Sequence, residues 1–232
     1  MQLKRKRVTA MTAIDKIIEI ARNEIGYLEK NSIGFIYDKT ANAGMGNYTK
    51  YWQEIKPEWQ GQPWCAVFVT WCFVQAFGRE NAERLLKHYP FTYVPQIAEL
   101  FVKHANPKRG DIVCFYKNGV FAHTGLVTDV QGDTFYTVEG NTSGASGVIA
   151  NGGGVCAKSY QNSKMTGTKF VRPDYSILTK ELVTINDIVW ELNTRGIIGN
   201  NELWLKKLES DVNAYWLARK TVNYIRNKET AY

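Results

Sequence analysis

The sequence predicts an α+β fold in which helices come first and an antiparallel sheet follows. Residues 12–25 carry apolar side chains at helical spacing, and a second apolar run with this spacing starts at Cys65 and stops near Gly78. After residue 111, short apolar runs alternate with turn signals, of which Asn118-Gly119 is the strongest hairpin dipeptide. Helices followed by antiparallel strands are typical of an α+β domain, with the helices packed on the sheet.

The remaining elements follow from local signals. Gly26 ends the first helix, and the glycines at 44 and 46 interrupt any periodicity, so residues 26–63 are predicted to be mostly loop. Shorter helices are expected over residues 80–87 and 95–104. Strands are expected over residues 112–117, 120–130, 134–140, 155–160 and 168–172.

Residues 173–175 have the features of a domain boundary, because the chain turns helical again beyond them. Helices are expected over residues 185–195, 201–209 and 211–227, with a small core formed by Leu203, Trp204, Leu208, Val212, Tyr215, Trp216, Val222 and Ile225. We therefore predict a disordered basic extension over residues 1–10, a main domain over 11–175 and a small all-α C-terminal domain over 176–232.

Composition and charge exclude several classes of protein. The net charge of +7 comes partly from the basic residues 4–7, which have no second basic block near them, so we expect no nucleic-acid partner. No apolar run reaches the length of a membrane span, and residues 8–13 are too short and too polar for a signal peptide. For the same reason we expect no membrane partner. The four cysteines show neither metal-site spacing nor a disulfide framework, so we expect reduced thiols.

Cys65 stands at the very start of the second apolar run. A thiol there lies over the positive end of the helix dipole, which favours the nucleophilic thiolate. Behind it an apolar stripe is expected to anchor the helix in a core, formed by Phe68, Val69, Cys72, Phe73 and Ala76. The alternative interpretation is that Cys65 is one more small buried hydrophobic residue.

Polar residues downstream favour the nucleophile. Of the three histidines, His88 and His104 lie in charged helical surroundings, whereas His123 lies within an expected strand. If residues 131–133 form a three-residue loop, Glu139 and Asn141 of the next strand lie on the histidine's face; a two-residue loop would put them on the opposite face. Such a set can perform acyl transfer, with a thiolate nucleophile, an imidazole base and a polar group that orients the imidazole.

These residues resemble a known family. The segments Trp64-Cys65-Ala66-x-Phe68-Val69, Gly110-Asp111-Ile112-Val113, His123-Thr124-Gly125-Leu126-Val127 and Glu139-Gly140-Asn141-Thr142 are similar to the CHAP domain, a family of cysteine, histidine-dependent amidohydrolases and peptidases. The resemblance spans about residues 14–175. It implies a papain-like fold and makes residues 11–175 the CHAP catalytic domain.

Site roles carried over by position follow from this resemblance. Cys65 is the nucleophile and His123 the base, while Glu139 and Asn141 are the orienting polar residues, either of which could contact the imidazole. The Cys65 backbone N–H and a nearby donor, for which Gln62 is a candidate, would form the oxyanion hole. Some members bind calcium through an Asp-rich loop, but this region offers Asp38 and no cluster, so we expect no metal and no other cofactor.

The resemblance implies peptidoglycan as the partner and cleavage of one of its amide bonds. The enzyme would be an N-acetylmuramoyl-L-alanine amidase or an endopeptidase of the stem peptide or cross-bridge. With no expected signal peptide and with a small C-terminal module, the chain resembles a bacteriophage endolysin. Such a protein is made in the host cytoplasm and acts on the cell wall after release, and we expect a monomer. The C-terminal helices would either bind the wall or stabilise the protein.

Two other functions are compatible with parts of the sequence. A secreted wall-remodelling cysteine peptidase typically has a histidine at the third catalytic position, and no second strand histidine is present here. A non-catalytic wall-binding protein on a hydrolase fold is the other alternative, and the intact set of Cys65, His123, Glu139 and Asn141 argues against it.

Overall fold

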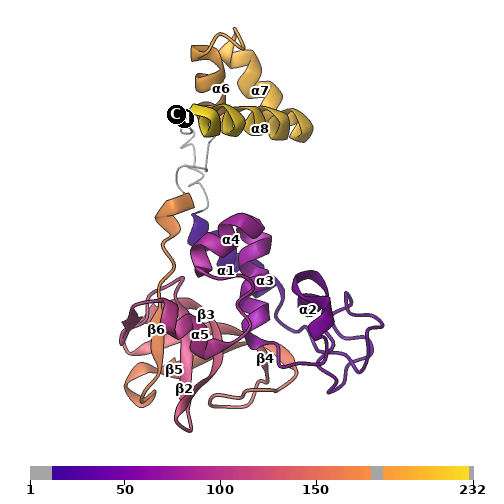
Figure 1. The fold of residues 1–232 in the computed structure, drawn as a ribbon, viewed down its shortest axis with the longest axis vertical. Coiled ribbons are helices and arrows are strands. Elements are labelled where there is room, and N and C mark those ends of the chain that lie inside the picture. The colour runs from indigo at the N-terminus through magenta and orange to yellow at the C-terminus, as the bar shows by residue number, and fades with distance from the viewer. Residues whose placement is uncertain (1–11, 179–184, 230–232) are drawn as a thin grey trace, which may run out of the picture. The chain divides into compact units, whose positions relative to one another are not determined.

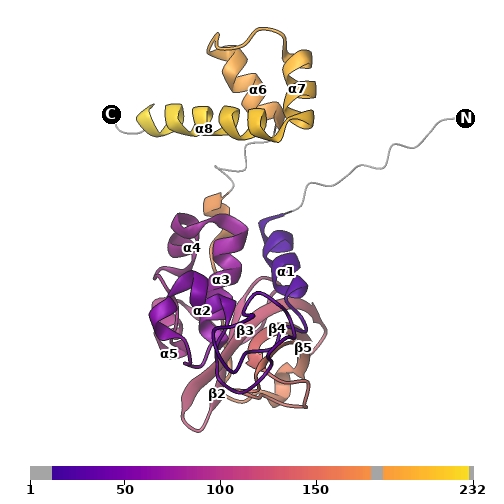
Figure 2. The ribbon, with the colours of Figure 1, turned by 90° about the vertical axis from the view of Figure 1, so that its right-hand side faces the viewer.

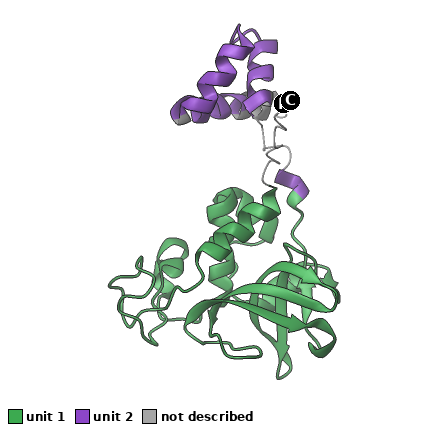
Figure 3. Cartoon of the chain, turned by 180° about the vertical axis from the view of Figure 1, so that it is seen from behind, with its two compact units in different colours: residues 1–175 green, residues 176–232 purple. Residues whose placement is uncertain are grey.

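The computed structural model describes residues 12–178 and 185–229. The chain divides into two compact units, residues 1–175 and 176–232 (Figure 3). Each unit has a buried apolar cluster of its own. The basic extension predicted over residues 1–10 lies outside the described residues.

Helices α1 (Ala13–Asn23), α3 (Cys65–Phe77), α4 (Arg79–Leu86) and α5 (Val94–Leu100) form where the sequence predicts them. Helix α1 begins with a capping box, in which the Thr12 hydroxyl accepts from the Asp15 backbone N–H at 3.1 Å and the Asp15 carboxylate accepts from the Thr12 N–H at 3.0 Å. Gly78 follows α3 with φ of +77°, a conformation that glycine adopts at little cost. Periodicity therefore predicts these helices, and a side-chain cap supports it at α1.

Residues 26–63 are mostly loop, as predicted, but they also contain helix α2 (Lys50–Ile55) and the 3-10 helix η1 (Pro57–Trp59). Thr49 caps α2, which at six residues is too short to show periodicity. One helix prediction about the first unit is wrong. His104 does not end a helix; it lies in strand β1 (Lys103–His104). His88 lies in the turn that follows α4.

The strands form a single antiparallel sheet in the order β1-β6-β2-β3-β4-β5 (Figure 1). Asn118 and Gly119, with φ of +52° and +86°, make the tight turn between β2 and β3. Helices together with an antiparallel sheet confirm the α+β class. The strands are β2 (Ile112–Lys117), β3 (Val120–Gln131), β4 (Thr134–Thr142), β5 (Gly154–Gln161) and β6 (Lys169–Val171), with 3-10 helices η2 (Asn162–Lys164) and η3 (Tyr175–Leu178).

Helix α3 is the central helix of the first unit. It packs against α1, α2 and α4 and against strands β3 and β4 (Figures 1 and 2). The sequence predicts one buried stripe, but the burial extends around the helix, since Ala66, Val67, Thr70 and Trp71 are buried as well. A helix that is apolar all round belongs in a core, and this position fixes the first residue of α3 against the sheet.

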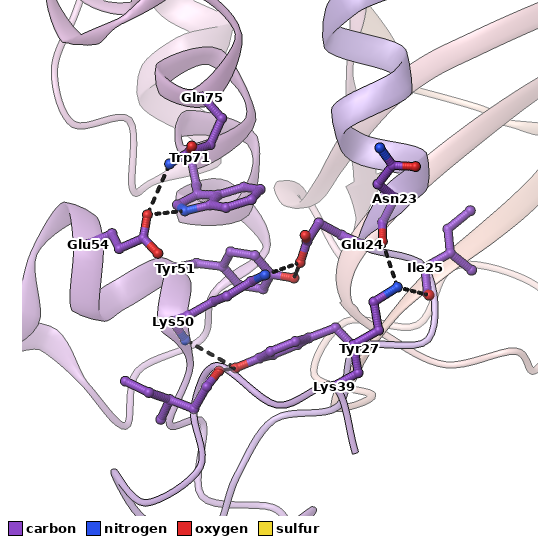
Figure 4. A network of polar contacts seen from close by, with 11 residues as sticks. Asn23, Glu24, Ile25, Tyr27, Lys39, Lys50, Tyr51, Glu54, Trp71 and Gln75 are labelled. Carbon is purple, nitrogen blue, oxygen red and sulfur yellow. Dashed lines mark hydrogen bonds and ion pairs between the residues drawn. The ribbon is translucent and has the colours of Figure 1, made fainter. Parts of the chain in front are cut away.

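A buried polar network joins the end of α1 to α2 (Figure 4). The Glu24 carboxylate accepts from the Tyr51 hydroxyl at 2.7 Å and lies 2.8 Å from the Lys50 ammonium. The ammonium also lies 4.9 Å from the centre of the Trp71 ring and 5.5 Å from that of Tyr27. These contacts attach α2 to α3.

The second unit contains α6 (Ile185–Thr194), α7 (Asn201–Ser210) and α8 (Val212–Glu229) within its described residues. Asn200 caps α7, and Gly196, with φ of +67°, follows α6. The buried cluster consists of Ile188, Val189, Leu192, Leu208, Ala218 and Val222. Two of the expected core residues, Leu203 and Trp216, are exposed.

Across residues 12–178 and 185–229, the structure has no helix with the length and apolar character of a membrane span.

Replacing Lys50 by Met should lower the free energy of unfolding by about 3 kcal/mol, because the buried Glu24 carboxylate would lose its ionic partner. The measurement is urea unfolding at neutral pH. The double variant Lys50→Met with Glu24→Met should recover most of the loss, since it removes the unpaired charge as well.

Arg109→Met is the matched control for this prediction. The Arg109 guanidinium lies 2.7 Å from the Asp15 carboxylate, but the two side chains are 40% and 41% exposed. Loss of this exposed ion pair should therefore change the free energy of unfolding little. Equal effects of Lys50→Met and Arg109→Met would contradict the assigned role of the Glu24–Lys50 pair.

Candidate active site

Cys65 is the first residue of α3, and no side chain caps this helix end. The preceding residue, Trp64, is fully buried and holds the start of the helix in place. Its indole N–H donates to Glu29 Oε2 at 2.7 Å, and its ring stacks on Tyr51 with 5.3 Å between the ring centres. The helix dipole therefore acts directly at Cys65, in the position that the sequence predicts for a nucleophile.

Glu29 is a buried residue of this region that the sequence interpretation missed. Its side chain is 3% exposed, and its carboxylate accepts from Trp64, which lies 35 positions further along the chain. The surrounding sequence contains no periodic signal that marks Glu29 as buried. A buried carboxylate with an indole donor fixes the Trp64 side chain and, through it, the start of α3.

The turn between β3 and β4 is shorter than the three-residue loop considered from the sequence. Gln131 pairs with Thr134, so the turn has two residues, Gly132 and Asp133, and the expected three-residue loop is wrong. The register then shifts by one residue between Val127 and Asp129. This bulge restores the pairing that the longer loop would have produced, since Leu126 lies opposite Val138.

His123 and Glu139 meet in the interior as a result. The imidazole Nε2 donates to Glu139 Oε2 at 2.8 Å, and both side chains are fully buried. Gly125 makes the contact possible, because a Cβ at that position would lie 2.5 Å from the Cγ atom of Glu139. The His123 ring also stacks on Phe115, with 5.7 Å between the ring centres.

The electrostatics of His123 favour the imidazolium. Burial disfavours the charged ring, but the interactions with Cys65, followed by those with Glu139, outweigh it and raise the pKa of His123 to about 9. Since Nε2 is bonded to Glu139, Nδ1 is the nitrogen that remains, and it has no hydrogen-bond partner among the described residues. The arrangement therefore holds one ring nitrogen and leaves the other for Cys65.

Gly140 allows strand β4, which carries Glu139, to lie close to the start of helix α3. A Cβ at Gly140 would lie 2.6 Å from the Phe68 Cβ and 2.9 Å from the Trp64 ring. Only a residue without a side chain permits this approach of β4 to the start of α3. The glycine between Glu139 and Asn141 therefore has a packing role in the site.

No hydrogen bond joins Asn141 to His123 in the described structure. Its backbone has φ of +56°, its carbonyl accepts from the Gly152 N–H at 2.9 Å, and its side-chain Oδ1 is buried without a hydrogen-bond partner among the described residues. Of the two orienting candidates, Glu139 is the one that binds the imidazole. Asn141 lies next to the site on the same strand.

Gln62 lies three positions before Cys65 with an exposed side chain. Its backbone carbonyl accepts from the Trp52 indole at 2.9 Å, and its N–H donates to the Trp59 carbonyl at 3.2 Å. These bonds hold the loop that precedes the nucleophile. No contact in the described structure assigns the Gln62 amide to an oxyanion site.

Asp111 has a structural role. Its carboxylate accepts two hydrogen bonds from the Arg172 guanidinium, both at 2.8 Å, and a third from the Lys108 N–H at 2.8 Å. This residue therefore joins the start of β2 to the end of β6. In the parts of the chain that the structure describes, no group of three His, Cys, Asp or Glu side chains is arranged to hold a metal ion.

Glu139→Gln should lower the pKa of His123 from about 9 toward its ordinary value of 6.5, because the carboxylate charge that favours the imidazolium is lost. A raised pKa contributes stability that is fully present below pH 6.5 and is lost as the pH rises through about 9. The free energy of unfolding of the variant should therefore vary less with pH over this range. The measurements are an NMR titration of His123 and urea unfolding at several pH values.

Glu19→Gln, an exposed change on α1, serves as the control and should leave the titration of His123 unaltered. An unchanged pKa of His123 in Glu139→Gln would contradict the assigned role of the carboxylate.

Comparison with protein families identifies part of the chain. Residues 57–141 match the family model described as the CHAP domain, and this range contains Cys65, His123, Glu139 and Asn141. Neither a curated protein nor a solved structure matches the chain. The family match supports a CHAP-domain protein, and CHAP domains are generally hydrolases that act on peptidoglycan, as amidases or peptidases.

Proposed function

We propose that this protein cleaves an amide bond of peptidoglycan by cysteine-dependent catalysis on a papain-like domain. The observation that supports this most directly is the buried hydrogen bond between His123 and Glu139, next to Cys65 at the start of α3, whose interaction with His123 raises the pKa of the imidazole. All three residues lie within the range that matches the CHAP domain. Cys65 is the nucleophile, His123 the general base and acid, and Glu139 the residue that orients the imidazole.

In the first half of the reaction, His123 takes the proton of the Cys65 thiol at Nδ1, which gives a thiolate and an imidazolium. The thiolate sulfur attacks the carbonyl carbon of the amide and forms a C–S bond. The tetrahedral intermediate then collapses, the C–N bond breaks, and the imidazolium gives its proton to the leaving amine. Glu139 stabilises the imidazolium throughout, because it accepts from Nε2.

In the second half, water attacks the thioester carbon while His123 accepts one of its protons. The C–S bond breaks, a carboxylic acid is released, and the Cys65 sulfur takes the proton back. Oxygen charge in both intermediates would be stabilised by the Cys65 backbone N–H at the uncapped end of α3, with the Gln62 amide as a second candidate donor.

The two candidate bonds are the one between N-acetylmuramic acid and L-alanine and those within the stem peptide or cross-bridge. We propose an endolysin, which reaches the wall after release from the host cytoplasm. Support comes from the resemblance and from the separate helical unit that follows the CHAP-containing unit. Mass spectrometry of digested walls, which identifies the newly freed amino groups, distinguishes an amidase from an endopeptidase.

Cys65→Ser should reduce lysis of purified cell walls at least about 100-fold, because a serine hydroxyl is a far weaker nucleophile than a thiolate in this arrangement. Turbidity loss measures lysis, and circular dichroism and pelleting with walls show that folding and binding persist. Cys114→Ser is the matched control, because this buried thiol on β2 lies opposite Thr124, whose side chain points to the other face of β3 from His123.

Lysis by Cys65→Ser at the rate of the unaltered protein would contradict the proposed mechanism. Absence of lysis by the unaltered protein, with wall binding retained, would favour a non-catalytic wall-binding protein.

We propose that the C-terminal unit binds the wall. In α6, Trp190 is 67% exposed and lines a hollow of about 340 Å³ together with the amide side chains of Asn186 and Asn201. An exposed aromatic ring beside amides is chemistry that suits a sugar polymer. The alternative is that the unit only stabilises the protein.

Trp190→Ala in the full chain should reduce pelleting with purified walls several-fold, because the ring that would stack on sugar is lost. Leu203→Ala is the matched control, because this residue of the same unit is 62% exposed and does not line the hollow. Equal pelleting by both variants and the unaltered protein would favour the stabilising role.

A further inference from the structure

The Glu139 carboxylate has more partners than the histidine. Its Oε2 accepts from His123 at 2.8 Å and from the Tyr160 hydroxyl at 3.3 Å, while its Oε1 accepts from the Thr137 hydroxyl at 2.5 Å. The carboxylate is completely buried, so these donors replace the water that would otherwise solvate it. Each oxygen is thus held by a different set of residues.

Thr137 makes the shortest of these contacts. It lies two positions before Glu139 on β4, so both side chains project from the same face of the strand. Its side chain is 1% exposed, which leaves no water to take the place of its hydroxyl. A hydrogen bond to a charged acceptor at this distance is among the strong ones in proteins.

Tyr160 is a weaker second donor. Its hydroxyl has one proton and two acceptors in reach, Glu139 Oε2 at 3.3 Å and the Gly147 carbonyl at 3.4 Å. Burial, and then the charge of Glu139, raises the pKa of Tyr160, so the hydroxyl keeps its proton and can only share it between the two. Of the two hydroxyl donors to the carboxylate, Thr137 is therefore the stronger.

We propose that Thr137 is a positioning residue of the active site, which holds Glu139 Oε1 so that Oε2 faces His123 Nε2 and Nδ1 is left for Cys65. This inference rests on the proposed function, in which His123 exchanges protons with Cys65. Thr137 does not touch the reacting atoms. It acts through Glu139.

Removal of the Thr137 hydroxyl has a definite electrostatic consequence. The titratable groups that face the His123–Glu139 pair are Cys65 from α3 and Tyr160 and Cys156 from β5; β2 contributes the apolar Phe115. Without the hydroxyl, Oε1 would be buried without a strong donor, and Oε2 would no longer be held toward Nε2. The second change weakens the contact that favours the imidazolium, so His123 should lose its proton at lower pH.

The first test uses NMR titration of the full chain labelled in its histidine rings, so it does not depend on hydrolysis. The protein has three histidines, and His123→Ala identifies the signal of His123. Thr137→Val should lower the midpoint of this titration by about one pH unit, since it loosens the hydrogen bond between His123 and charged Glu139, and such a bond is worth about one to two pH units. Thr137→Ser, which keeps the hydroxyl, should leave the midpoint in place.

Thr124→Val is the matched control for the loss of a buried hydroxyl. The Thr124 hydroxyl donates to the Val113 carbonyl at 2.7 Å, and its residue is fully buried, but it does not contact Glu139. This variant should lose stability without a shift in the titration. Thr137→Ala removes the same hydroxyl as Thr137→Val with less steric change, and it must shift the titration in the same direction.

The second test measures wall lysis against pH. Thr137→Val should lyse walls about tenfold more slowly than the unaltered protein, with the high-pH limit of the profile moved to lower pH, and Thr137→Ser should restore both. An unchanged titration midpoint in Thr137→Val and Thr137→Ala would overturn the role of Thr137. Absence of lysis by the unaltered protein would overturn the proposed function and leave the titration result standing.

Discussion

The buried hydrogen bond between His123 and Glu139 is the constraint on which the site depends. A carboxylate and an imidazole can both leave water only when each finds a partner, and the 2.8 Å contact provides one. Two glycines near this hydrogen bond permit the close packing that it requires. Gly125 leaves space for the Glu139 side chain, and Gly140 allows β4 to approach the start of α3, where Cys65 lies.

Buried carboxylates also organise the surroundings of the site. Glu29 holds the Trp64 indole and, with it, the first turn of α3. Glu24 binds Lys50 and Tyr51, and the Tyr51 ring stacks on Trp64. The position of Cys65 therefore depends on two charged residues that lie before α2 in the chain. Apolar packing buries α3, while these polar contacts determine where its first residue lies.

The site extends beyond the residues that match the CHAP domain. The match begins at residue 57 and ends at 141, so it includes Cys65, His123, Thr137 and Glu139. Glu29 comes before this range and Tyr160 after it, yet Glu29 fixes the start of α3 and Tyr160 donates to the Glu139 carboxylate. Residues at both sides of the matched range thus complete the environment in which the chemistry would occur.

Local pattern was enough to predict the β2–β3 turn and the helices other than α2, because periodicity, caps and turn residues act over a few positions. It singled out Cys65 and His123 as candidates and left Glu139 and Asn141 as alternatives. Tertiary structure alone decided three things: the bulge between Val127 and Asp129 that sets the register, the choice of Glu139 over Asn141, and the burial of Glu29. A bulge depends on how two strands pack. A buried carboxylate depends on donors far away in the chain, such as Trp64 and His123. The residues next to the bulge or to a buried carboxylate in the sequence therefore do not indicate either feature.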